Sequence, residues 1–254
     1  PADQVPAMPR EHKLAAAEPL AVREGETRAR VALRTVQHVV EQAGIGVVRE
    51  PVVLMGASRT DAGVHARGQM GAFTCGGEGE ATGWPTSRGT DRLLRAINGR
   101  LPEDVLVTAC AEASPDFDPI RGATSKAYSY TLHVSPPPPR GEGLRPLWDR
   151  RYVHHVWEPL DAGAMETAAQ AVVGEHDFAA FAAAGHGRLS TVRTVFSCGV
   201  TRLADVAGAQ RLRIDITGNG FLWNMVRIIA GTLVDVGRGR IQPDAIAAII
   251  ASGD

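Results

Sequence analysis

The sequence predicts an α+β fold built from two similar mixed halves. First, stretches with helical apolar spacing and stretches with strand-like spacing alternate irregularly along the 254 residues, which disfavours a doubly wound parallel sheet. Second, successive strand-like stretches follow one another closely, as in hairpins, which indicates a mainly antiparallel sheet. Third, a chain of this length can bury a core as one large domain or as two small ones.

The first half is expected to contain two helices and three strands. Apolar residues at helical spacing, among them Val31, Val36 and Val40, predict the first helix. A β-branched run that ends at Gly56 predicts a strand, and Gly99 is expected to stop the second helix. In chain order, the expected elements are a helix over 30–43, strands over 51–55 and 70–74, a helix capped by Thr90 or Asp91, and a strand over 105–110.

The second half is expected to repeat this mixture. From Tyr128 to Val134, alternate residues are large and apolar, which predicts a half-buried strand over 127–134. The prolines that follow at 136–139 exclude a helix or a central strand and predict a surface loop. The remaining expected elements are a helix over 161–173 capped by Asp161, strands over 196–203 and 211–216, a helix that begins near Phe221, and a last helix that begins at Pro243.

These expectations divide the chain into four parts. Residues 1–29 are rich in Pro, Glu and Ala and are expected to be poorly structured. Residues 30–112 form the N-terminal half, and residues 113–149 form a connection that includes one strand and the proline-rich loop. Residues 150–254 form the C-terminal half.

The composition indicates a globular cytoplasmic protein and does not by itself indicate a nucleic-acid-binding protein. The formal net charge is −1, although 25 of the 27 basic residues are arginines. Three widely spaced cysteines favour buried thiols over a metal site or a disulfide. No apolar run is long enough to span a membrane, so we expect no membrane association.

One loop, over 56–69, carries the residue types that catalysis needs. It follows an expected strand, is rich in small residues, and presents Asp61 beside Arg59 and Arg67. A neighbouring arginine favours the ionised carboxylate, and such a carboxylate can act as a nucleophile or stabilise a sugar cation. Alternatively, this is an ordinary turn whose aspartate caps a helix while Arg59 pairs with it on the surface.

The order of several motifs resembles the tRNA pseudouridine synthase A (TruA) family. The most specific match is the run from Arg59 to Ala66, followed by Gly68-Gln69. Together the matches cover roughly residues 30–252. Besides that loop they are Asn98-Gly99-Arg100-Leu101-Pro102-Glu103-Asp104, Phe117-Asp118-Pro119-Ile120-Arg121-Gly122-Ala123, Lys126-Ala127-Tyr128-Ser129-Tyr130, His176-Asp177-Phe178, Thr191-Val192-Arg193 and the stretch from Phe221 to Gly237.

The resemblance implies a pseudouridine synthase fold with a cleft between its halves. It also implies an enzyme that converts uridine to pseudouridine at positions 38 to 40 of the tRNA anticodon arm, acting as a homodimer without a metal or cofactor. Asp61 matches the catalytic aspartate and Tyr128 the tyrosine that stacks on the target base. Arg59 and Arg121 match substrate-binding arginines, although a surface charge is the alternative for Arg121. For Arg193 and Arg227, a role in RNA binding and an ordinary salt bridge remain equally open.

Departures from the family pattern keep other functions open. The opening strand and the closing strand of the family are not recognisable, so we expect a terminally divergent or truncated member. Ser58 replaces a glycine before Arg59, which would cost stability if that position needs a positive φ. Besides an active synthase, the alternatives are a catalytically inactive RNA-binding homologue and a hydrolase of glycosidic bonds. The hydrolase lacks a convincing second carboxylate.

Overall fold

The computed structural model describes residues 34–76, 82–140, 143–183 and 189–253. The described residues divide into two compact units, one that ends at Ala123 and one that begins at Thr124. The expected poorly structured segment over 1–29 lies outside the described residues. No helix in the described ranges combines the length and the apolar character that crossing a membrane requires.

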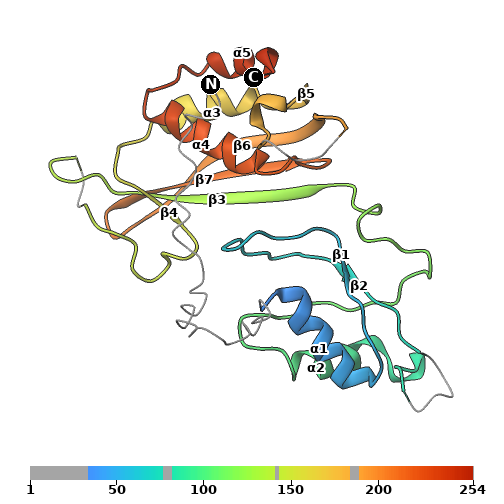
Figure 1. Cartoon of the computed structure of the whole chain (residues 1–254). Helices are drawn as coiled ribbons and strands as arrows, with labels where there is room; N and C mark the ends of the chain where they lie inside the picture. The colour runs from blue at the N-terminus through green and yellow to red at the C-terminus, as the bar shows by residue number, and fades with distance from the viewer. Residues whose placement is uncertain (1–33, 77–81, 141–142, 184–188, 254) are drawn as a thin grey trace, which may run out of the picture. The chain divides into compact units, whose positions relative to one another are not determined.

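In the first unit, helices α1 (Val36–Val48) and α2 (Thr90–Asn98) enclose a small core (Figure 1). The buried core residues are Ala43, Val48, Val52, Leu93 and Ile97. Helix α1 was expected over 30–43 but begins at Val36, because the Thr35 hydroxyl caps it by accepting the His38 N–H at 3.1 Å. Helix α2 is capped by Gly89 instead of Thr90 or Asp91, and it ends at Gly99 as expected.

The first expected strand pair is confirmed but is short. Strands β1 (Met55–Gly56) and β2 (Gly71–Ala72) pair antiparallel. The β1–β2 ladder does not extend back through Leu54, because side chains of α1 already form hydrogen bonds with the backbone N–H and carbonyl of Leu54. The Leu54 N–H donates to Glu41 Oε1 at 2.9 Å, and the Leu54 carbonyl accepts from Gln37 Nε2 at 3.0 Å. Helix α1 therefore fixes the chain immediately before the loop that carries Asp61.

The prediction of a strand over 105–110 is wrong. Residues 105–110 form no strand, because the side-chain amide of Asn98 takes the place of a neighbouring strand. Asn98 Nδ2 donates to the Val107 carbonyl at 2.8 Å, and the Val107 N–H donates to Asn98 Oδ1 at 2.9 Å. Both backbone groups of Val107 are thus satisfied without a strand partner.

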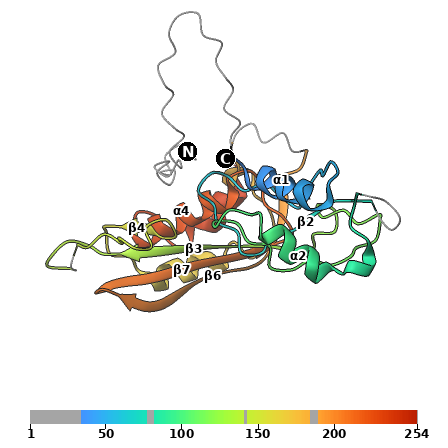
Figure 2. The ribbon, with the colours of Figure 1, turned by 90° about the horizontal axis from the view of Figure 1, so that it is seen from below.

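The second unit contains a five-stranded sheet in the order β4-β3-β7-β6-β5. Only the β3–β4 pair is parallel, so the mainly antiparallel sheet is confirmed. The long strand β7 lies between β3 and β6 (Figure 2). The strands are β3 (Lys126–Val134), β4 (His154–Val156), β5 (Gly174–Asp177), β6 (Val192–Val206) and β7 (Ala209–Gly218).

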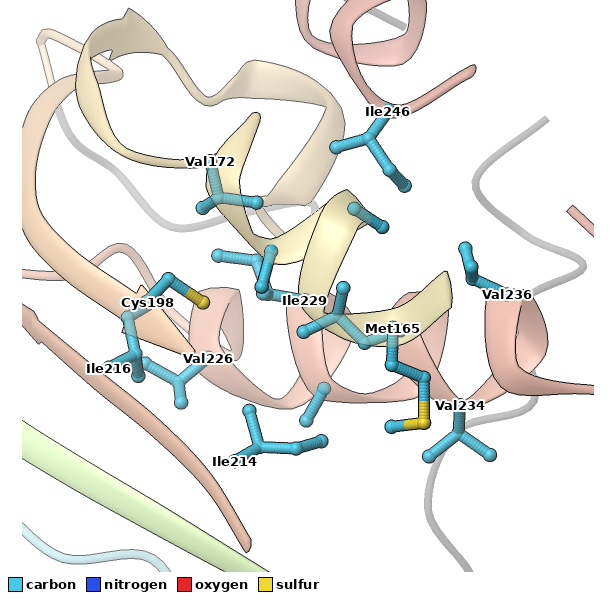
Figure 3. Close-up of a cluster of buried hydrophobic side chains, with 14 of the residues drawn as sticks. Met165, Val172, Cys198, Ile214, Ile216, Val226, Ile229, Val234, Val236 and Ile246 are labelled. Carbon is cyan, nitrogen blue, oxygen red and sulfur yellow. The ribbon is translucent and has the colours of Figure 1, made fainter. Parts of the chain in front are cut away.

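Three helices cover one face of this sheet and close its core (Figure 1). They are α3 (Ala162–Gln170), α4 (Met225–Gly237) and α5 (Ala245–Ser252). Figure 3 shows Met165 of α3 and Ile229 of α4 among aliphatic residues of β7 such as Ile214. As expected, Asp161 caps α3, its carboxylate accepting the Ala164 N–H at 3.0 Å.

Short 3-10 turns and loops connect these elements. The turns are η2 (Thr86–Arg88) in the first unit and η3 (Ala179–Phe181) in the second. The helix expected to begin near Phe221 begins at Met225 instead, because Asn224 before it has a φ of 59°. Residues 136–140 form the expected loop. Together the two units confirm the α+β class.

Candidate active site

Asp61 lies in the loop over 57–70 that joins β1 to β2. The two ends of this loop are held together, because the Ala57 N–H donates to the Met70 carbonyl at 2.9 Å. Gln69 Nε2 donates across the loop to the Ser58 carbonyl at 2.5 Å. These contacts continue the β1–β2 ladder through a side chain and fix the base of the loop.

A tight turn forms the tip of this loop. The Val64 N–H donates to the Asp61 carbonyl at 3.1 Å, and Gly63 between them has a φ of 81°. A turn with a positive φ at its third residue favours glycine. Gly63 therefore allows the chain to reverse directly after the candidate catalytic residue.

The Asp61 side chain is exposed, and its carboxylate has no hydrogen-bonding or ion-pairing partner among the described residues. It caps no helix, and no ion pair joins it to Arg59 in the described ranges. The alternative of a capping aspartate paired with Arg59 is thus not what the structure contains. Arg59 and Arg67 are exposed on the same loop, so the loop presents one carboxylate and two guanidinium groups to solvent.

Ser58 is compatible with the backbone of this loop. Among the described residues, the only ones other than glycine with a positive φ are Arg49, Ala207 and Asn224. The φ of Ser58 is therefore not positive. The serine that replaces the family glycine adds no left-handed strain before Arg59.

Arg121 lies on a turn that Asp118 organises. Asp118 Oδ1 accepts the backbone N–H groups of Ile120 at 2.7 Å and of Arg121 at 3.0 Å. These two hydrogen bonds lower the pKa of the Asp118 carboxyl. The Arg121 side chain is 89% exposed and lies 3.6 Å from the other Asp118 oxygen. An exposed pair of this kind leaves the guanidinium available to an anion.

Tyr128 lies on β3, in the second unit, and packs against the edge of the main core. Its ring meets the ring of Phe221 edge-on, with centroids 5.4 Å apart and planes at 85°. Gly218 makes room for this pair, since a Cβ there would lie 3.2 Å from Phe221 Cζ and 2.8 Å from the Thr194 carbonyl oxygen. The end of β7 thus accommodates the ring that supports Tyr128.

The two weaker candidates differ in their surroundings. Arg193 Nη1 donates to the carbonyls of Ser190 at 3.1 Å and Val192 at 2.6 Å, so this guanidinium braces its own segment. Arg227 lies on α4, is half-buried, and forms no ion pair with any described residue. The ordinary salt bridge considered for Arg227 is therefore not found in the described ranges.

The candidate residues belong to both units. Asp61, Arg59 and Arg121 lie in the first unit, and Tyr128 lies in the second. Arg59 and Asp61 share one loop, whereas no hydrogen bond or ion pair joins Arg121 to that loop in the described ranges. In the part of the chain that the structure describes, no three His, Cys, Asp or Glu side chains are grouped as a metal site requires.

Three residues that support the site were part of the matching motifs, but the sequence analysis assigned them no role of their own. Gln69 closes the loop of Asp61, Asp118 shapes the turn of Arg121, and Phe221 contacts Tyr128. Only the role of Asp118 could have been predicted from the local sequence. An aspartate that accepts the backbone N–H groups two and three residues after it is typical of an Asx turn. The other two contacts depend on the fold.

Comparisons with known proteins give a consistent result. The model of a family described as tRNA pseudouridine synthase matches residues 168–254. The tRNA pseudouridine synthase A of Pelobacter propionicus is 39% identical over 221 residues, which are 86% of this chain and 81% of the relative. That of Geobacter sulfurreducens is 40% identical over 222 residues, 85% of this chain and 80% of the relative. That of Geotalea uraniireducens is 39% identical over 220 residues, 87% and 82% of the two chains.

Proposed function

Because the chain belongs to the tRNA pseudouridine synthase A family, we propose that it isomerises uridine to pseudouridine in tRNA. The reaction breaks the N1–C1′ bond of the nucleoside, turns the uracil and forms a C5–C1′ bond; the hydrogen at C5 leaves as a proton, and N1 takes up a proton. No net electrons move, so the residues of the protein have to bind, orient and transfer a proton.

Asp61 is the proposed catalytic residue. The observation that carries this proposal is its position at the tip of a loop closed by Gln69, with the carboxylate open to solvent. A carboxylate held in this way can reach the sugar of a nucleotide that has left the stack. Arg59, on the same loop, is proposed to contact the RNA backbone and hold the emptied position open.

Tyr128 is proposed to stack on the target uracil and to accept the proton from C5. Extraction of a base from a helix costs a few kcal/mol, and stacking on an aromatic ring returns about 1–3 kcal/mol. Its contact with Phe221 supports this role, because an edge-on neighbour restricts rotation of the tyrosine ring. Arg121, exposed on its turn, is proposed to bind a phosphate.

The finer assignments are also proposals. We propose uridines at positions 38 to 40 of the anticodon arm as the targets, a homodimer as the assembly and the cytoplasm as the location. They rest on the motifs from Arg59 to Ala66 and around Tyr128, which resemble those of the family. Mapping pseudouridine along tRNA by chemical adducts that stop reverse transcription would test the positions, and sedimentation would test the dimer.

Release of tritium from tRNA labelled at uracil C5 tests the reaction itself, because the C5 hydrogen must leave. We expect the unaltered chain to release tritium and Asp61→Asn to release it at least about a thousandfold more slowly. Asp91→Asn is a matched control, since Asp91 is an exposed carboxylate on α2 of the same unit. Salt-sensitive tRNA binding by the unaltered chain without release would instead indicate an inactive RNA-binding homologue.

A further inference from the structure

An exposed segment before β4 carries an unusual density of large apolar and basic side chains. Trp148 is 92% exposed, and Leu147 and Tyr152 are each 63% exposed. Arg150 and Arg151 lie between them and are also exposed. These five residues form what we call the Trp148 surface. A tryptophan held in water forgoes the burial of a large apolar area, so such a surface indicates a binding partner.

The exposure of this surface is fixed by the fold and does not result from a loose loop. Leu144, at the start of the segment, donates its N–H to Ser135 Oγ at 2.9 Å, and the Leu144 carbonyl lies 3.1 Å from His133 Nε2. Asp149, in its middle, binds the buried guanidinium of Arg211 on β7 at 2.6 Å. His133 and Arg211 are on strands of the sheet and Ser135 directly follows β3, so the residues around Trp148 are held in position facing solvent.

A turn within the segment adds to this rigidity. The Tyr152 N–H donates to the Asp149 carbonyl at 2.8 Å, and Arg150 Nη1 donates to the Leu147 carbonyl at 2.9 Å. At the base, the guanidinium of Arg145 lies over the ring of Trp157, 5.3 Å from its centroid. These hydrogen bonds within the segment therefore hold its shape, and the side chain of Trp148 remains exposed to solvent.

The charge of the segment selects the class of partner. Between residues 143 and 153 there are three arginines, and the only acid is Asp149. Its charge is matched by Arg211 beneath the segment. The outward charge is therefore positive. Contact with a second copy through a two-fold axis would place these arginines against themselves, which is unfavourable. Phosphate groups complement them, and an exposed indole ring can stack on any unpaired base.

We propose that the Trp148 surface is an RNA-binding surface, on which Arg150 and Arg151 contact phosphates and Trp148 stacks on an unpaired base. This inference rests on the proposed function for the choice of tRNA as the RNA. It adds a contact that the motifs of the family resemblance do not include, because the segment lies between the matches at 126–130 and 176–178.

Binding is measured in the full chain carrying Asp61→Ala, so that the result does not depend on catalysis. We expect Trp148→Ala to weaken binding of unmodified tRNA about 5- to 150-fold. Arg151→Gln should lower the slope of log affinity against log salt by about 0.9. Arg202→Gln is the matched control, because Arg202 is an exposed arginine of the same unit that is paired with Asp205; it should leave the affinity within about twofold.

The outcomes separate this inference from the proposed function. Unchanged tRNA affinity in Trp148→Ala and Arg151→Gln would overturn the inference, even if the unaltered chain forms pseudouridine. Loss of self-association on sedimentation, with unchanged RNA affinity per protomer, would overturn it in favour of a contact between copies. Weakened binding in both variants, with no tritium release by the unaltered chain, would support the RNA-binding surface and refute the synthase. Because Trp148 and Arg151 are exposed, neither variant is expected to disturb folding.

Discussion

Phe221→Leu should slow the proposed reaction without abolishing it, because we propose that Phe221 orients Tyr128. The rings meet edge-on at 5.4 Å between centroids. An aromatic pair of this geometry contributes about 0.5–1.5 kcal/mol beyond the burial of its area. Leucine keeps most of the apolar volume and removes the ring edge, so this contribution is what the substitution removes. If all of it holds the tyrosine in its reactive orientation, kcat should fall by about 2- to 13-fold.

Tritium release at saturating tRNA measures this effect on kcat. Phe196→Leu is the matched control, because Phe196 is a half-exposed phenylalanine of β6 in the same unit, and we expect it to leave kcat unchanged. A double variant with Tyr128→Leu isolates the pair: the effect of Phe221→Leu should disappear once the tyrosine ring is gone. An undiminished effect in that background, or a kcat for Phe221→Leu equal to that of the control, would refute the proposed orienting contact.

Three further perturbations follow from the local structure. Gly63→Ala should destabilise the loop of Asp61 by about 1–2 kcal/mol and slow tritium release, because the φ of Gly63 is 81°; Gly68→Ala, where a Cβ would meet no other atom, is the control. Asp149→Asn should lower the free energy of unfolding in urea by about 1–3 kcal/mol, because the Arg211 guanidinium is buried; unchanged stability would contradict this. Burial lowers the pKa of His154, so the unfolded chain takes up its proton first as the pH falls below about 6.5. Stability should therefore decrease from pH 6.5 toward pH 5, and His154→Gln should flatten this decrease in thermal melts.

The sequence predicted those elements whose signal is local. The alternating residues from Tyr128 to Val134 form β3, and Asp161 caps α3 as expected. In both cases the residues that determine the structure lie within one element, so periodicity or a cap is sufficient. The resemblance of the motifs indicated the family, and the similarity of this chain to members of the family confirms it. The catalytic role of Asp61 stays a prediction.

The two strand predictions that failed share a physical cause, namely side chains that replace backbone partners. Residues 105–110 have the composition of a strand, but Asn98 satisfies both backbone groups of Val107. The first strand is shortened because Gln37 and Glu41 bind Leu54. Such contacts join residues 9 to 17 positions apart. No local sequence pattern predicts these contacts, since they depend on the packing of a helix against a loop.

The same kind of contact explains how the first unit fixes the loops that carry the candidate residues Asp61 and Arg121 with so little sheet. Gln69 closes the loop of Asp61 and Asp118 shapes the turn of Arg121, each by hydrogen bonds from a side chain to backbone. One such bond contributes only about 0.5–1.5 kcal/mol net, but it fixes several residues at once. A catalytic carboxylate needs a position fixed to within about half an ångström. In the first unit this fixation therefore comes from individual polar side chains, whereas in the second unit Tyr128 obtains it from the sheet and from Phe221.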